Sequence, residues 1–251
     1  MAFFRLSTWA LGAIVLFVAG QAAATTSYGS YAGPSVTYTT MQETSSSGDP
    51  EPIFGAPTGL GDQLLFFPAN FTANANPVDG TFDHTGSQFQ AVITGNTPTT
   101  VLTDFNLTEF GDAQIFGSGG TAATGTYAAL AGFLTVTHDI NGPISPVVIP
   151  FTGTFAPSDN LNYVNDFGVT IWSASVSIDI TAYVANAHSF TLSLDNDLYA
   201  FSEASTSAKI QKKVVDGPSV IIEVIPEPGT ALLVGSGLLI MSLRGRRSRV
   251  A

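Results

Sequence analysis

Residue types that perform catalysis or bind metals are scarce and scattered in this sequence. There is no cysteine, which excludes a thiol nucleophile, a thiolate zinc site and a disulfide framework. His84, His138 and His188 are far apart, and none has the i, i+4 or H-x-H spacing of a preformed metal pair. We interpret them as surface or strand-end residues. The G-x-S-x-G and G-x-x-x-x-G-K signatures are also missing, so we predict neither a nucleophile elbow nor a phosphate loop.

The acidic residues offer two further kinds of site. Asp195-Asn196-Asp197 could supply hard oxygen ligands to Ca²⁺. The EF-hand spacing is missing, however, and the apolar runs on both sides favour a hairpin turn, where Asn and Asp are well tolerated. We interpret Asp159-Asn160 and the segment Asp139–Gly142 as loops for the same reason. We therefore predict no cofactor, no metal ligand and no catalytic residue.

Glycoside hydrolysis requires two carboxyl groups about 5–10 Å apart. A pair such as Asp195 and Glu203 has little diagnostic value among 19 acidic residues. Carbohydrate binding demands less, because an exposed aromatic platform and a few polar groups suffice. Tyr163, Trp172, Tyr183 and Tyr199 are the candidate platform residues, although Trp172 lies in an apolar alternating face that is typical of a core. We predict a protein that is not an enzyme.

Charge is segregated along the chain. The net charge is -11, and all 19 acidic residues lie between Glu43 and Glu227. The basic residues of that region are Lys209, Lys212 and Lys213. An acidic body with so small a basic cluster repels phosphate backbones, so a nucleic-acid partner is excluded.

The N-terminal residues 1–24 have the three parts of an export signal. Arg5 precedes an apolar stretch from Leu11 to Gly20, and Ala22 and Ala24 occupy the A-x-A positions of a cleavage site. An apolar stretch of this length spans only about half of the ~30 Å hydrocarbon core as a helix. We therefore predict a cleaved signal peptide, with the cut after Ala24, rather than a retained anchor.

The C-terminal residues 226–251 contain Pro226-Glu227-Pro228, an apolar run from Gly229 to Leu243 and an arginine-rich end. As a helix the run would measure about 22 Å, which is short for a membrane span. The two prolines prevent the helix from extending upstream. Arginines after the run hold its end in the cytoplasm. We predict a short transmembrane helix with the rest of the mature chain on the opposite side.

This order of elements resembles the PEP-CTERM sorting signal of Gram-negative bacteria. The resemblance implies that Pro226, Glu227 and Pro228 form the motif recognised by the membrane protease exosortase. It also implies that residues 229–243 are the transient membrane segment, and that the stop-transfer residues are Arg244, Arg246 and Arg247. The alternative is a plain C-terminal tail anchor.

Between these ends, residues 25–225 are expected to form one all-β domain. Short β-favouring runs are bounded by Gly, Pro, Asn and Asp. From Thr170 to Ile178 the residues alternate, with Trp172 and Val176 on one face and serines on the other. We expect roughly ten strands in an antiparallel β-sandwich of jelly-roll type. Residues 25–50 are expected to be loosely structured around one strand at 35–40, and residues 180–187 could form a short helix.

The body is also similar to PEP-CTERM proteins with a single β-sandwich domain, including the stretch SFTLSLDNDLYAFSEASTSAKIQKK. This resemblance brings no activity with it. It implies an exported bacterial protein that is held transiently in the inner membrane with its body on the periplasmic side, processed by exosortase, and then located at the cell surface or outside the cell. We expect a structural or matrix role with extracellular polysaccharide. The alternatives are a carbohydrate-binding module, Ca²⁺-assisted or not, and a polysaccharide hydrolase or lyase.

Overall fold

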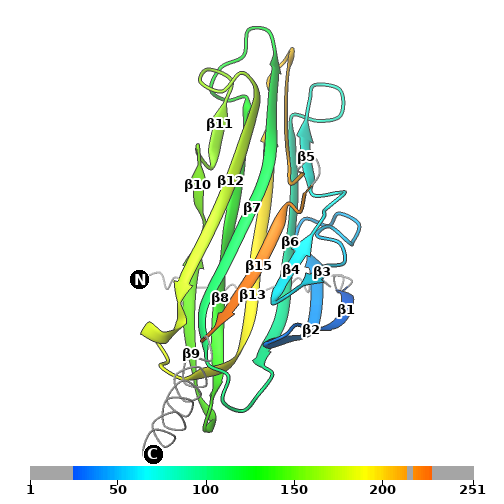
Figure 1. Ribbon diagram of the computed structural model, residues 1–251. Helices are drawn as coiled ribbons and strands as arrows, with labels where there is room; N and C mark the ends of the chain where they lie inside the picture. The colour runs from blue at the N-terminus through cyan, green and yellow to red at the C-terminus, as the bar shows by residue number, and fades with distance from the viewer. Residues whose placement is uncertain (1–24, 214–216, 228–251) are drawn as a thin grey trace, which may run out of the picture.

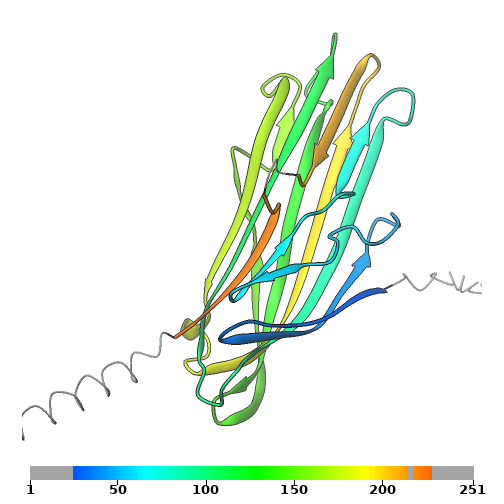
Figure 2. The same ribbon diagram turned by 45° about the vertical axis from the view of Figure 1, so that its right-hand side comes forward.

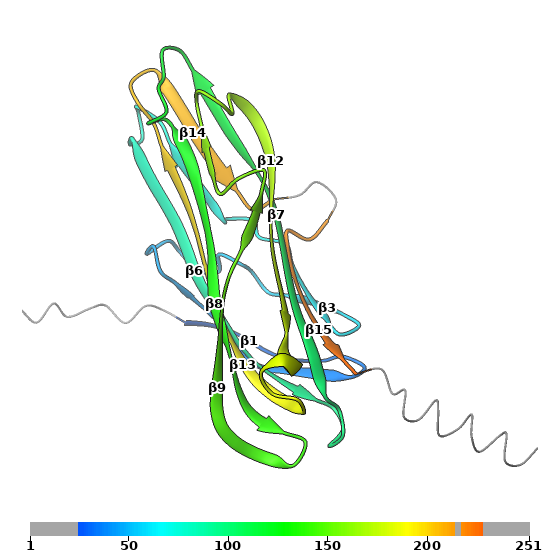
Figure 3. The same cartoon turned by 90° about the vertical axis from the view of Figure 1, so that its left-hand side faces the viewer.

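The computed structural model describes residues 25–213 and 217–227. These residues form an all-β body of two antiparallel sheets packed as a sandwich, with almost no helix (Figure 1). Most of the long strands run along the length of the molecule (Figure 1), and the two layers separate clearly when the body is viewed from the side (Figure 3).

The first sheet has seven strands. They are β1 (Thr25–Ala32), β2 (Val36–Ser45), β6 (Phe82–Gly95), β8 (Gly125–Asp139), β9 (Gly142–Thr152), β11 (Asn160–Asn162) and β13 (Ala187–Phe201). Their order is β1-β2-β6-β13-β8-β11, and β9 also pairs with β8. Strand β13 is therefore central, and its register with β6 and β8 decides which side chains meet on the outer face.

The second sheet has eight strands. They are β3 (Thr58–Leu60), β4 (Gln63–Phe66), β5 (Thr72–Ala75), β7 (Leu102–Gly117), β10 (Thr154–Ala156), β12 (Gly168–Asp179), β14 (Thr206–Gln211) and β15 (Val220–Pro226). The main path is β10-β12-β7-β15-β4-β3, and β14 pairs with both β5 and β7.

The core lies between the two sheets and is filled by alternate residues of their facing strands. In β12, Trp172, Ala174, Val176 and Ile178 are buried, whereas the three serines between them are partly or fully exposed. The two-residue period predicted for this segment is confirmed. The core includes a cluster of four phenylalanines whose contacting ring centroids are 5.0–6.0 Å apart: Phe54, Phe66, Phe71 and Phe89.

Residues 25–50 differ from the loose segment that the sequence predicted. They contain two paired strands, β1 and β2, which lie at an angle to the long strands at one edge of the body (Figure 2). Although the segment is rich in Ser, Thr and Gly, two tyrosines hold it in place. Tyr38 is fully buried, and its hydroxyl donates to the Asp62 carbonyl at 2.6 Å. The side chain of Tyr28 donates to the buried carboxylate of Glu43.

The described residues form fifteen strands, more than the roughly ten expected, because β3, β10 and β11 are three-residue strands too short to show a pattern. In the segment 180–187 only Ile180–Ala182 is helical, as a single 3₁₀ turn. The Asp179 side chain caps this turn by accepting from the Ala182 N–H at 3.2 Å.

Candidate functional site

The outer face of the seven-stranded sheet carries a strip of aromatic side chains from three adjacent strands. We call Phe82, His84, Tyr127, Tyr199 and Phe201 the aromatic strip. In the register of the sheet, Tyr199 of β13 lies between His84 of β6 and Tyr127 of β8, and Phe201 lies beside Phe82. Residues of odd number in this part of β13 face outward, whereas Leu198 and Ala200 between them are fully buried.

The rings of the aromatic strip support one another. The His84 ring stacks on Tyr199 with centroids 4.3 Å apart and an interplanar angle of 7°. Tyr127 and Tyr199 have centroids 5.8 Å apart, and Phe82 and Phe201 are separated by 5.3 Å. The His84 Nε2 atom lies 2.7 Å from Asp197 Oδ1, which fixes the imidazole in place. Because these residues lie on paired strands rather than loops, the strip is a preformed surface.

The aromatic strip is exposed to solvent to an extent that core aromatics are not. Phe82 is 56% exposed, Phe201 39% and Tyr127 37%. A contiguous group of exposed rings on a rigid sheet is unusual for a surface without a partner. The faces of such rings carry partial negative charge and attract C–H groups with partial positive charge, such as those on the apolar face of a sugar.

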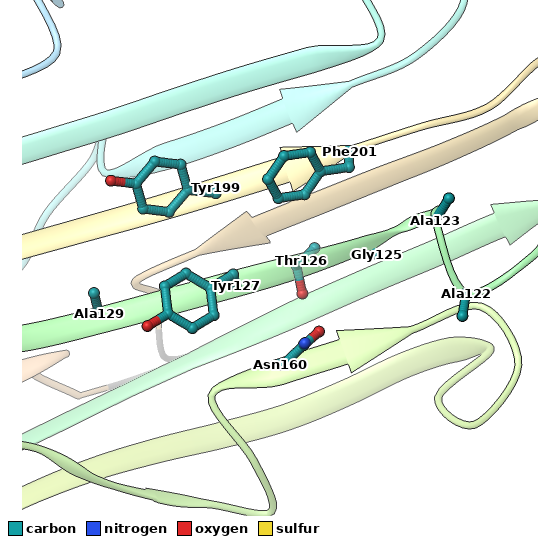
Figure 4. A pocket seen from close by; sticks show the side chains of 9 residues that line it. All are labelled: Ala122, Ala123, Gly125, Thr126, Tyr127, Ala129, Asn160, Tyr199 and Phe201. Carbon is teal, nitrogen blue, oxygen red and sulfur yellow. The ribbon is translucent and has the colours of Figure 1, made fainter.

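A pocket of about 440 Å³ adjoins the strip and is drawn in Figure 4. Tyr199 and Phe201 of β13 and Tyr127 of β8 line one side, and Asn160 of β11 lies across from them (Figure 4). Thr126 also borders this pocket, but its Oγ1 is buried and has no hydrogen-bond partner among the described residues. The amide of Asn160 is a polar group that a ligand in the pocket could bind.

A row of polar side chains continues from the strip along the same face. Gln42 donates to Gln90, Gln90 to Gln88 and Gln88 to Asp195, with donor–acceptor distances of 3.0, 3.0 and 3.1 Å. We call these four residues the amide ladder. Each amide keeps further donor or acceptor capacity toward solvent. The ladder thus offers hydrogen bonds at fixed positions beside the aromatic strip.

Burial and a neighbouring carboxylate keep the Tyr199 phenol neutral. Partial burial raises the pKa of Tyr199 above its ordinary value of 10.0, and the negative charge of Asp197 adds to this effect. At the end of β13, hydrogen bonds from Thr121 and Thr124 hold the pKa of the exposed carboxyl of Glu203 below its usual value. Glu203 is therefore ionised and occupied in fixing the 121–124 loop next to the pocket.

The four aromatic residues proposed from the sequence have different surroundings. Tyr199 lies in the aromatic strip, whereas Trp172 is buried between the sheets, as its alternating pattern predicted. Tyr183 is exposed but follows the 3₁₀ turn, outside the strip. Tyr163 is partly buried and donates to the Gly117 carbonyl at 3.2 Å. Phe82, His84, Tyr127 and Phe201 were not anticipated, because only strand register brings them to Tyr199.

The interpretation of Asp195-Asn196-Asp197 as a hairpin turn is wrong. All three residues lie inside β13, paired with β6 on one side and β8 on the other. Asn196 is buried and faces the core, whereas Asp195 and Asp197 face outward. The three side chains cannot gather round one Ca²⁺ ion. The segment Asp139–Gly142, by contrast, does form the turn between β8 and β9.

The carboxylates of Asp195 and Glu203, which the sequence offered as an example of a pair, lie far apart. Asp195 lies six residues before the end of β13 and Glu203 lies beyond that end, so strand rise separates them by about 20 Å, twice what glycoside hydrolysis allows. His188 Nδ1 lies 2.9 Å from the Thr100 carbonyl, and His138 Nδ1 lies 3.1 Å from Thr137 Oγ1. Within residues 25–213 and 217–227, no group of three His, Asp or Glu side chains could hold a metal ion.

The residues of the predicted sorting signals lie mostly outside the described part of the chain. This applies to Ala22 and Ala24, to Pro228, and to the arginines Arg244, Arg246 and Arg247. Pro226 is the last residue of β15, and the Glu227 N–H donates to the Val101 carbonyl at 2.8 Å. Among the described residues no helix is long and apolar enough to cross a membrane.

Comparisons with known proteins return little. No protein-family model and no curated protein matches the sequence. Among solved structures, the infectious bursal disease virus Gt strain shares 14% identity with a TM-score of 0.15 over 85% of this chain and 60% of that chain. The VP2 subviral particle of the same virus shares 12% identity with a TM-score of 0.14 over 84% and 59%. The chain thus spans about 60% of the length of these viral chains, and likenesses at such TM-scores bear on neither fold nor function.

Proposed function

We propose that the protein binds a polysaccharide chain along the outer face of the seven-stranded sheet. The observation that carries this proposal is the aromatic strip, in which exposed rings from three adjacent strands lie in register beside a ladder of amides. Sugars present alternating C–H and hydroxyl surfaces, and the strip and the amide ladder offer partners for both. The body would thus act as a binding module of an extracellular matrix.

Binding is favoured over hydrolysis by the composition of the site. The pocket beside the strip is lined by small, aromatic and amide residues and contains no carboxylate, whereas glycoside hydrolysis uses two. Asp197, which precedes Tyr199 on β13, forms a hydrogen bond with His84. The pocket itself therefore offers recognition groups and no carboxylate, and the two carboxylates of the adjoining face, Asp195 and Asp197, are held in hydrogen bonds by Gln88 and His84.

Alanine at Tyr199 is expected to weaken polysaccharide binding by about 10- to 30-fold, because this ring lies at the centre of the strip and contacts both His84 and Tyr127. The affinity is measured by glycan array, followed by affinity electrophoresis or calorimetry on the best ligand, with and without EDTA. We expect EDTA to have no effect. Loss of binding in EDTA would assign the site to a Ca²⁺-assisted module instead.

The matched control is Tyr183→Ala, which removes a tyrosine ring that is 57% exposed but lies outside the strip. Its affinity should equal that of the wild type. If Tyr199→Ala and Tyr183→Ala bind equally well, or if no polysaccharide binds the wild type, the aromatic strip is not a carbohydrate site.

We further propose that the chain is exported through residues 1–24 and sorted through residues 226–251 by exosortase, as the resemblance to PEP-CTERM proteins implies. The position of the motif at the end of the sandwich supports this proposal. Pro226 completes β15, and Glu227 makes the last backbone hydrogen bond described. A cut after this point would release the body with both sheets complete.

Removal of residues 228–251 is expected to abolish retention in the inner membrane while leaving β15 and its bond to Val101 intact. Cell fractionation of wild type and truncated protein measures this, and mass spectrometry identifies the C-terminus of the wild-type mature form. The arginine-rich end should be missing from mature wild-type protein. Its presence on protein shed from the cells would contradict processing, and persistence of the intact precursor in the membrane would indicate a plain anchor.

A jelly-roll connectivity is part of the same proposal. The pairs β2–β6, β6–β13 and β8–β13 join strands that are distant in the sequence, as the long connections of Greek-key and jelly-roll sandwiches do.

A further inference from the structure

The core contains three polar side chains that the binding face does not use. Lys212, Glu109 and Asn196 are each 1% exposed and lie in hydrogen-bonding contact with one another between the two sheets. We call them the buried triad. Asn196 belongs to β13 of the seven-stranded sheet, and Glu109 belongs to β7 of the eight-stranded sheet. Lys212 directly follows β14 of the latter sheet. The triad therefore bridges the layers.

The surroundings of the triad are apolar and aromatic. The Lys212 Nζ atom lies 4.8 Å from the Phe71 ring centroid, 5.9 Å from Phe54 and 6.0 Å from Trp172. A buried ion pair in such a place gives little net stability compared with apolar residues of similar volume. Packing alone therefore gives no reason for a lysine, a glutamate and an asparagine to meet here.

The hydrogen bonds of the buried triad bring an amine, a carboxamide and a carboxylate into contact. Lys212 Nζ donates to Asn196 Oδ1 and to Glu109 Oε2, and Asn196 Nδ2 donates to Glu109 Oε1 at 2.6 Å. One carboxylate thus contacts both the amine nitrogen and the amide nitrogen. An amine adjacent to a carboxamide is a nucleophile beside an acyl carbon, and a carboxylate that contacts both nitrogens can carry protons between them.

We propose that Lys212 and Asn196 become joined by an intramolecular isopeptide bond, whose formation Glu109 catalyses as a general base and acid. Glu109 takes a proton from the Lys212 ammonium, and the freed lone pair attacks Asn196 Cγ. The Nζ–Cγ bond forms, the Cγ–Nδ2 bond breaks, and Nδ2 leaves as ammonia. Of the five hydrogens on the two nitrogens, one stays on the new amide, three leave with ammonia and one remains on the Glu109 carboxyl. No oxidant or cofactor is required.

Burial supports this chemistry in two ways. Desolvation lowers the pKa of Lys212 below its ordinary value of 10.5, against the opposing attraction of Glu109, which makes the free amine more accessible. Exclusion of water also keeps the acyl carbon from hydrolysis. The product would tie the two sheets together covalently in a chain that has no cysteine for disulfides.

The wild-type protein tests the proposal by its mass. Under denaturing conditions, the purified mature chain is expected to be lighter than its sequence by the mass of one ammonia. A protease that cuts after glutamate locates the loss, because Glu203 lies between Asn196 and Lys212. Peptides 110–203 and 204–223 should stay joined after digestion. If the mass equals that of the sequence and the two peptides separate, the triad is a non-covalent buried pair and the proposal is wrong. This measurement does not depend on any variant folding.

Variants test the role of each group. Glu109→Gln, which keeps the shape of the side chain but removes the carboxylate, and Lys212→Arg are both expected to show no mass loss. Lys213→Arg is the matched control, because it changes the neighbouring lysine outside the triad and should keep the full loss. A complete mass loss in folded Glu109→Gln would remove Glu109 from the reaction, and its persistence in Lys212→Arg would place the bond elsewhere.

Discussion

Replacing Glu43 with alanine is expected to lower the free energy of unfolding by about 3–5 kcal/mol. Glu43 of β2 is fully buried, and its Oε1 accepts hydrogen bonds from the Ile53 N–H at 2.6 Å, the Phe54 N–H at 2.8 Å and the Ser87 hydroxyl at 2.9 Å. Its Oε2 accepts from the Tyr28 hydroxyl. Alanine leaves buried donors without a partner, and each costs about 1–3 kcal/mol.

Chemical unfolding followed by circular dichroism measures this change. Glu51→Ala is the matched control, because Glu51 also accepts a backbone N–H, from Ser45 at 2.6 Å, and a hydroxyl, from Thr26 at 2.8 Å. Water reaches this partly exposed side chain, so its loss is expected to cost about 1 kcal/mol or less. Equal costs for Glu43→Ala and Glu51→Ala would show that burial does not set the value of these bonds.

A β-bulge before Glu43 explains why the start of the domain was predicted poorly. Simple alternation from Val36 and Tyr38 places even-numbered residues inside. At Thr40, however, φ is +48° and the register with β6 shifts, which is a β-bulge. After the bulge, Met41 and Glu43 face inward instead. A sequence shows alternation but not the position of a bulge, so β2 was expected to end at residue 40.

Strand β12, which has no such irregularity, was predicted well. In β12 the alternation of Trp172, Ala174 and Val176 with serines holds from residue 172 to residue 178, because one face packs on the core and the other faces solvent. The expected all-β character of residues 25–225 also holds, since among the described residues the helix is one 3₁₀ turn. Local pattern and composition therefore sufficed for the fold class.

The candidate site could be predicted only in part, because it depends on which strands are neighbours. Tyr199 was proposed as a platform residue from its type alone. Its contacts with His84 and Tyr127 come from the pairing of β13 with β6 and β8. Local sequence patterns do not show which distant strands pair. The same pairing shows why the turn predicted at residues 195–197 is wrong. In a strand buried between two neighbours, Asn196 points to the core and reaches Lys212 and Glu109.

The triad and the aromatic strip use opposite faces of the same strand. Asp197 and Tyr199 belong to the outer face of β13, and Asn196 and Leu198 belong to its inner face. A covalent tie at Asn196 would fix the central strand of the binding face to the opposite sheet. Force applied by a ligand on the strip would then be borne by the covalent Lys212–Asn196 bond as well as by packing contacts. The two proposals remain independent, because mass spectrometry tests one and glycan binding the other.

Trp172→Ala is expected to lower the free energy of unfolding by about 3–5 kcal/mol. It removes the largest buried side chain of the described core and leaves a cavity in its place. The Trp172 ring packs against Phe155, with centroids 6.3 Å apart, and lies over Lys212. Trp172→Phe should cost only about 1–2 kcal/mol. It keeps much of the volume and removes the buried Nε1–H, which has no hydrogen-bond partner among the described residues.

Thermal and chemical unfolding followed by far-ultraviolet circular dichroism measures these costs, since that signal does not depend on the indole that is removed. Ile171→Ala is the control on the same strand. Ile171 is 70% exposed, so truncating it should change stability by less than about 0.5 kcal/mol. A cost for Ile171→Ala as large as that for Trp172→Ala would place the core on the other face of β12. A cost for Trp172→Phe as large as that for Trp172→Ala would show that the indole N–H is paired in solution.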